Sequence, residues 1–173
     1  MIEVKCVKLN EEQNKFVNSL KGIEYTAFSI AIKTHGNKVY HQGYYCYGSL
    51  IKELVHVIDI AMQCETKEER IVALLHEVVA QNILSSEQIS KVIKNKKVLR
   101  ALKTLENDPM FKDNKYYEII KKNDIARKVV ILDLKYLCDK AGGPYFTGFL
   151  TDYAGYITKT KRFLEHKDND SNP

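Results

Sequence analysis

The chain contains 173 residues, of which 45% are hydrophobic and 28% charged, a composition that excludes a disordered polypeptide and is large enough for a real core. Its 27 basic and 22 acidic side chains leave a net charge of +5, a mild excess spread along the chain. No apolar run reaches the roughly 18 residues that span a membrane. The first residues do not resemble a signal peptide, and the four cysteines lack metal-type spacing. We therefore expect a cytoplasmic protein with one domain over residues 1–166 and a disordered tail at 167–173.

Only three prolines and eight glycines occur, so long stretches without helix breakers favour helices. Asn10 is expected to cap the first helix, and Thr66 with Glu69 forms a capping-box pattern before a later, apolar and therefore central helix. The apolar periodicity predicts helices at residues 11–20, 25–34, 49–62, 65–81, 85–93, 96–105, 114–122, 124–139 and 153–166. We predict an all-α bundle of about eight helices, with a short strand or an irregular arm at 1–9, a Tyr-rich loop at 39–48 and a turn at 107–110.

One carboxylate is placed where the helical pattern expects an apolar side chain. Asp133 lies in the expected helix 124–139, and residues three and four positions away share its face. An ionised carboxylate on such a face costs several kcal/mol unless a cation compensates it. The neighbours on that face are Val129, Val130, Tyr136 and Leu137.

Two other apolar segments also contain titratable side chains. His76 and Glu77 lie side by side within the apolar run 71–79, and His56 lies within the run 54–58. Two imidazoles and two carboxylates, each in a segment typical of a core, could together hold one divalent metal ion. The sequence therefore makes His56, His76, Glu77 and Asp133 the candidate metal ligands.

Each candidate ligand also has a purely structural interpretation. His56 could be a partly exposed helical histidine, and His76 a core histidine bonded to a backbone carbonyl. Glu77 could be solvated at the edge of its helix. Asp133 could pair with Lys128 or Lys135, although spacings of five and two residues are poor for one helix face.

The order His56, then His76-Glu77, then a distant Asp133 resembles the HD-domain phosphohydrolases, most closely the Rel/SpoT type that hydrolyses (p)ppGpp. In that family a histidine, a His-Asp pair and a distant aspartate hold a divalent metal. The segments 27–36, 66–79 and 116–134 look like helices of that domain, so the similarity covers about residues 25–165. The resemblance implies an HD-like bundle, a divalent cofactor for which Mn²⁺ suits the mixed donors, and a phosphorylated small-molecule substrate, a nucleotide.

The sequence departs from the family pattern at several positions. Glu77 replaces the aspartate of the His-Asp pair, and Ala80 and Gln81 replace a Glu-Asp pair that serves catalysis in the Rel/SpoT hydrolases. Val130 and Leu137 replace a lysine and an asparagine around the last aspartate. The primary prediction is a metal-dependent phosphohydrolase acting on a nucleotide or related phosphate ester. The alternative is a degenerate HD domain that binds a nucleotide or a protein partner without hydrolysis.

The substrate side of the site is predicted from polar residues between the second and third expected helices. His35, Lys38 and Tyr44 are the candidate substrate-binding residues, although an ordinary polar loop would contain the same residue types. No general base is evident, and the oligomeric state stays open. A third hypothesis, a nucleic-acid-binding helical protein, depends on the basic segment 91–100 and is disfavoured, because such a run is more often a solvated helix face.

Overall fold

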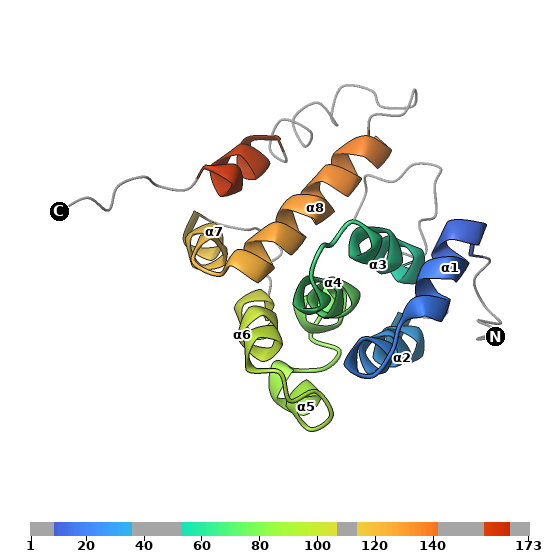
Figure 1. Cartoon of the computed structure of the whole chain (residues 1–173). Helices are drawn as coiled ribbons and strands as arrows, with labels where there is room; N and C mark the ends of the chain where they lie inside the picture. Colours follow the sequence, from blue (N-terminus) through green and yellow to red (C-terminus); the bar gives the residue numbers. More distant parts are fainter. Residues whose placement is uncertain (1–8, 36–52, 107–113, 142–157, 167–173) are drawn as a thin grey trace.

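The computed structural model describes residues 9–35, 53–106, 114–141 and 158–166, and these form a helical bundle (Figure 1). Residues 158–165 are also helical, and the described ranges contain no strand, so the all-α prediction is confirmed for them. The helices are α1 (Glu11–Ser19), α2 (Ile23–His35), α3 (Glu53–Met62), α4 (Lys67–Ala80), α5 (Ser86–Ser90), α6 (Lys96–Leu105), α7 (Asn114–Lys121) and α8 (Asp124–Ala141).

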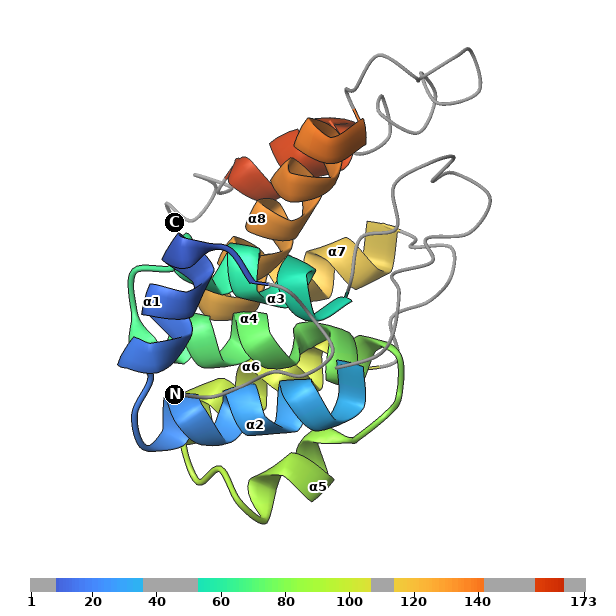
Figure 2. The ribbon, with the colours of Figure 1, turned by 90° about the vertical axis from the view of Figure 1, so that its right-hand side faces the viewer.

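Helix α4 is the central element of the bundle. It contacts α2, α3, α6 and α8, and both ribbon views place it inside the ring that these four helices form (Figures 1 and 2). Every residue from Ile71 to Val79 is buried, which is why this segment is apolar nearly all round. A polar residue within this run is therefore surrounded by other helices whichever way it points.

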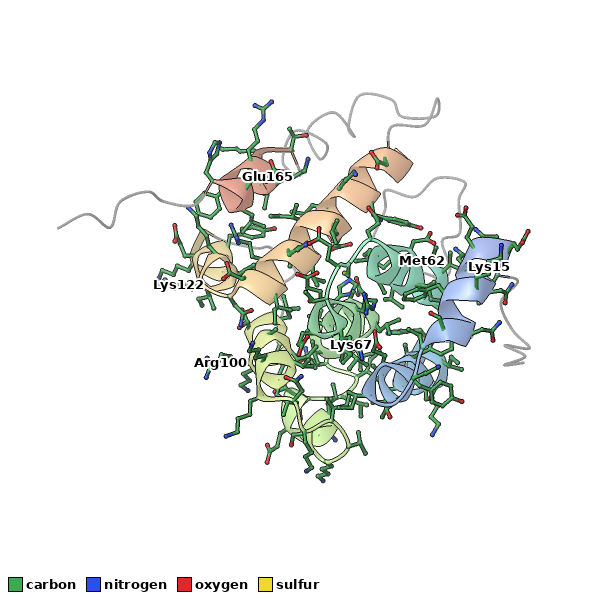
Figure 3. The ribbon with its side chains drawn as sticks, viewed as in Figure 1. Lys15, Met62, Lys67, Arg100, Lys122 and Glu165 are labelled. Carbon is green, nitrogen blue, oxygen red and sulfur yellow. The ribbon has the colours of Figure 1, made fainter. Side chains whose placement is uncertain are left out.

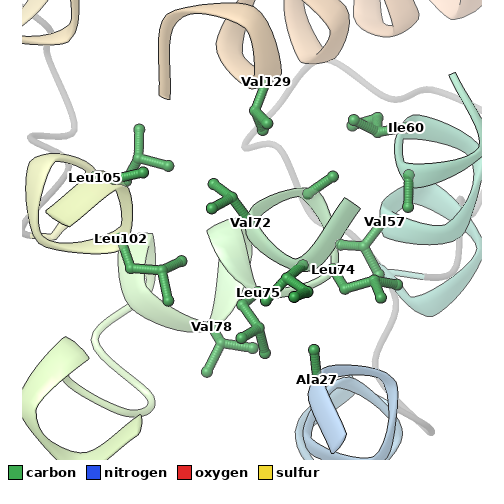
Figure 4. Close-up of a cluster of buried hydrophobic side chains, with 14 of the residues drawn as sticks. Ala27, Val57, Ile60, Val72, Leu74, Leu75, Val78, Leu102, Leu105 and Val129 are labelled. Atoms are coloured by element: carbon green, nitrogen blue, oxygen red, sulfur yellow. The ribbon is translucent and has the colours of Figure 1, made fainter. Parts of the chain in front are cut away.

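The hydrophobic side chains of α4 extend toward all four neighbouring helices (Figure 4). Close packing of this kind fixes the separation and rotation of the helices that surround α4. The labelled residues of this cluster are Ala27 on α2, Val57 and Ile60 on α3, Val72, Leu74, Leu75 and Val78 on α4, Leu102 and Leu105 on α6, and Val129 on α8.

The helix starts follow the capping signals in the sequence. Asn10 and Gln13 form a capping box at α1, and Thr66 and Glu69 form one at α4, in which each side chain accepts from the other residue's backbone N–H. Helix α5 ends at Ser90, earlier than the predicted residue 93. There the backbone N–H groups of residues 92 and 93 both donate to the carbonyl of Ile89, which tightens the chain into a turn.

The lysines and Arg100 that Figure 3 labels are all exposed side chains. One partly buried pair joins two helices, because Arg70 Nε donates to Glu24 Oε1 at 2.6 Å between α4 and α2. None of the described helices is both long and apolar enough to cross a membrane. Residues 1–8 of the predicted segment 1–9, the Tyr-rich loop, the turn at 107–110 and the tail at 167–173 lie outside the described residues.

The capping box at the start of α4 gives a direct stability prediction. Thr66→Ala removes the acceptor for the Glu69 N–H and should lower the free energy of unfolding by about 1 kcal/mol. Thr66→Ser keeps the hydroxyl and should retain most of the stability. Urea denaturation of the three proteins measures the effect, and equal loss in both variants would show that the hydroxyl is not the stabilising group.

Candidate metal centre

Three helices bring the four predicted ligands to one place. His56 comes from α3, His76 and Glu77 come from α4, and Asp133 comes from α8. All four side chains are buried, and one potential donor atom from each lies within 4.8 Å of the other three. Such a group could hold a metal ion. The convergence that the sequence predicted is therefore present in the fold.

The spacing of the donor atoms suits a single ion. His56 Nε2 lies 3.2 Å from Asp133 Oδ1 and 3.7 Å from Glu77 Oε1, and His76 Nε2 lies 3.5 Å from the same Glu77 oxygen. Metal–ligand bonds of about 2.1 Å place adjacent ligands about 3.0 to 3.4 Å apart and opposite ligands about 4.2 Å apart. The three separations above fall between these two values, and the widest pair of the group, at up to 4.8 Å, would have to close by about 0.6 Å to match opposite ligands (4.8 − 4.2).

A backbone hydrogen bond fixes the orientation of the His76 ring. Its Nδ1 lies 2.7 Å from the carbonyl oxygen of Ala73, one turn earlier on α4. Since a carbonyl only accepts, Nδ1 carries the proton, and the lone pair of a neutral imidazole is left on Nε2. Nε2 is buried and makes no hydrogen bond within the described part of the chain. The carbonyl contact expected of a core histidine is therefore present, and it is also the contact that orients a ligating histidine.

The two oxygens of Glu77 have different environments. Oε2 accepts a hydrogen bond of 2.8 Å from the side-chain amide of Gln81, whereas Oε1 faces the two imidazoles. Gln81 thus holds the carboxylate so that one oxygen is directed into the cluster. In the family comparison Gln81 is only the replacement of an acidic residue. Its spacing of four residues from Glu77 on one helix is the sequence signal that predicts a contact between the two side chains.

Charge compensation inside the cluster shifts two pKa values. Burial opposes the charged form of His56, but the carboxylates of Asp133 and Glu77 outweigh it and raise the pKa of His56 from 6.5 to about 9. Burial likewise opposes the charged form of Glu77, but His56 and His76 hold the pKa of Glu77 well below its usual range. At neutral pH the metal-free cluster thus contains an imidazolium between two carboxylates. If a divalent cation replaced the proton of His56, its two positive charges would balance the negative charges of the two carboxylates.

Most of the purely structural interpretations do not hold. His56 is fully buried rather than partly exposed, and Glu77 is buried rather than solvated. Lys128 lies 3.0 Å from Glu65 and 3.4 Å from Glu69, so its ion pairs join α8 to the start of α4 instead of compensating Asp133. The cation closest to Asp133 in the described structure is the imidazolium of His56.

Of the three predicted substrate-binding residues, only His35 lies in the described part of the chain. His35 ends α2 and is fully buried, and its proposed contact with substrate stays a prediction. Lys38 and Tyr44 lie outside the described residues. In the basic segment the lysines and Arg100 are exposed around the end of α5 and on the outer face of α6, as a solvated helix face would be.

No protein-family model matches this chain, and no curated protein does so either. The HD resemblance therefore depends on the four residues, their order and their placement.

The raised pKa of His56 predicts how the stability of the metal-free protein depends on pH. Protonated His56 stabilises the folded state fully below pH 6.5, and this contribution is lost as the pH rises through about 9. At about 1.4 kcal/mol per pKa unit, the upper limit of the loss is ~3 kcal/mol. Urea denaturation in EDTA across this range measures it. His56→Gln should remove this part of the pH dependence, and identical profiles for the two proteins would contradict the assignment.

Proposed function

We propose that this protein is a metal-dependent phosphohydrolase of the HD-domain type, acting on a nucleotide or a related phosphate ester. The observation that carries the proposal is the buried convergence of His56, His76, Glu77 and Asp133 within 4.8 Å. Their order along the chain, a histidine, a His-carboxylate pair and a distant aspartate, supports the HD type. Buried titratable groups whose pKa values are strongly shifted by one another are more typical of functional sites than of cores.

The residues fit a divalent ion in donor type as well as in spacing. Two imidazole nitrogens and two carboxylate oxygens form a mixed set that suits Mn²⁺ among first-row ions. An ion held there would polarise a phosphoryl oxygen and lower the pKa of a bound water. The protein's own contribution is orientation, since the Ala73 carbonyl fixes the His76 ring and the Gln81 amide fixes the Glu77 carboxylate.

A specific contact favours the alternative function, a degenerate HD domain that binds without hydrolysis. Gln81 stands where the Rel/SpoT hydrolases have an acid that serves catalysis, and its amide is committed to Glu77. Ala80, at the other such position, offers no titratable group. A protein of this kind would keep the fold and a nucleotide pocket but would not turn substrate over.

Metal content tests the proposal first. Wild-type protein incubated with Mn²⁺ and then desalted should contain close to one ion per chain by elemental analysis, because four donors hold it. Asp133→Ala should lose most of that metal. Asp124→Ala, an aspartate on the exposed side of the same helix, is the matched control and should retain it. Wild-type protein without bound Mn²⁺ would contradict the hydrolase proposal.

Phosphate release then separates the hydrolase from the degenerate domain. Mn²⁺-loaded protein is assayed against nucleoside diphosphates, triphosphates and guanosine nucleotides that carry an additional 3′-diphosphate. The proposal predicts that the wild type releases phosphate and that Asp133→Ala does not. EDTA should stop the release by the wild type, and excess Mn²⁺ added afterwards should restore it. Nucleotide binding without release from any of these substrates would favour the degenerate domain.

A further inference from the structure

A second group of polar side chains lies beside the candidate metal centre, and the proposed ligand set does not include it. Gln13 from α1, Asp59 from α3 and Tyr136 from α8 meet there. Gln13 Nε2 donates to Asp59 Oδ1 at 2.6 Å, and the Tyr136 hydroxyl is near enough to the same carboxylate for its charge to raise the pKa of the tyrosine. Gln13 and Tyr136 are only 5% and 7% exposed, so a polar group left unsatisfied on either side chain would be costly.

Helical spacing places this group one turn away from the metal ligands. Asp59 follows His56 by three residues on α3, and Tyr136 follows Asp133 by three residues on α8. Residues three apart share a helix face, so each helix presents one member of the candidate metal centre and one member of the adjacent polar group. The two groups therefore form consecutive layers between α3 and α8.

The two layers are joined by an aromatic contact. The rings of Tyr136 and His56 meet edge to face, with centroids 4.9 Å apart and planes inclined by 72°. The His76 ring is also close to His56, with centroids 5.5 Å apart and planes inclined by 54°. The His56 imidazole thus packs against one ring from α8 and one from α4, and these contacts restrict its rotation.

We propose that Tyr136 is a positioning residue for His56, held in place by Asp59 and, through Asp59, by Gln13. The inference rests on the proposed metal site, because it assigns Tyr136 the task of directing His56 Nε2 toward the bound ion. A phenylalanine would supply a similar ring but no hydroxyl to donate to Asp59, so in this proposal it would leave the tilt of the ring less well fixed. Residues that orient a metal ligand without touching the metal change metal affinity about 10- to 100-fold when they are removed.

The electrostatics of the tyrosine agree with this role. Burial, together with the negative charge of Asp59, raises the pKa of Tyr136 above its usual range. The hydroxyl therefore keeps its proton and is available to donate to Asp59. Because Gln13 donates to the same carboxylate, the proposed Tyr136–Asp59 bond would link α1 to the ring that packs against His56.

Cobalt binding tests the proposal, with Co²⁺ alone as the probe, because its visible absorption reports both affinity and coordination geometry. Tyr136→Phe should weaken Co²⁺ binding about 10-fold and change the shape of the absorption bands. Tyr117→Phe removes the hydroxyl of another buried tyrosine, on α7, and is the matched control. Its affinity and spectrum should match the wild type. Equal effects of the two substitutions would overturn the proposal.

A pair of substitutions at Asp59 separates positioning from simple loss of stability. Asp59→Ala removes the acceptor for Tyr136 and should weaken Co²⁺ binding about as much as Tyr136→Phe does. Asp59→Asn keeps an acceptor oxygen and should recover most of the affinity. If the asparagine variant binds as weakly as the alanine variant, the hydrogen bond is not what positions the ring.

A metal-free measurement keeps this inference separable from the metal proposal. In EDTA the ring resonances of His56, assigned by their absence in His56→Gln, should shift in Tyr136→Phe and stay unchanged in Tyr117→Phe. Wild-type protein that binds no Co²⁺ while showing these shifts would defeat the metal proposal but support the ring contact. If Tyr136→Phe leaves both the His56 resonances and Co²⁺ binding as they are in the wild type, Tyr136 does not position His56. That result would leave the metal proposal standing.

Discussion

The fold is built around a requirement for charge compensation in its centre. Two carboxylates, Glu77 and Asp133, are buried beside the middle of α4, where uncompensated negative charge would cost several kcal/mol. In the metal-free protein the imidazolium of His56 provides part of the compensation. One positive and two negative charges still leave an excess of negative charge. A divalent ion would remove that excess, which explains why acidic side chains are tolerated at positions that packing alone would give to leucine or valine.

Helix α4 makes this arrangement possible because all its faces are covered. Its apolar side chains set the positions of α2, α3, α6 and α8, and its two polar residues inside the buried run, His76 and Glu77, meet groups from α3 and α8. The supporting contacts are local, since Ala73 and Gln81 lie three and four residues from the side chains they orient. The candidate metal centre is therefore as rigid as the helix that contributes half of it.

Much of the fold and of the candidate site could be predicted from the sequence, for reasons of helix geometry. The capping boxes at Asn10 and Thr66 appear in the sequence because they involve residues three apart. Asp133 was identifiable as anomalous because a helix places residues three and four apart on one face. The four candidate ligands could be grouped from the sequence because each interrupts an apolar segment and their order resembles that of a known family.

Other parts could not be predicted, because they depend on how helices pack against one another. Gln13 and Asp59 are distant in sequence, and their hydrogen bond exists only because α1 lies against α3. Helical periodicity places Tyr136 on the apolar face of its helix and gives no sign that its hydroxyl lies near the carboxylate of Asp59 on α3. The burial of His56 likewise depends on the approach of α4 and α8, which periodicity within α3 does not encode.

Anomalous diffraction from a crystal of the protein grown or soaked with Mn²⁺ tests the central claim most directly. The account predicts one strong peak among the donor atoms of His56, His76, Glu77 and Asp133, at about 2.0 to 2.4 Å from each. A map with no peak between these side chains, or with manganese bound only at other residues, would contradict it.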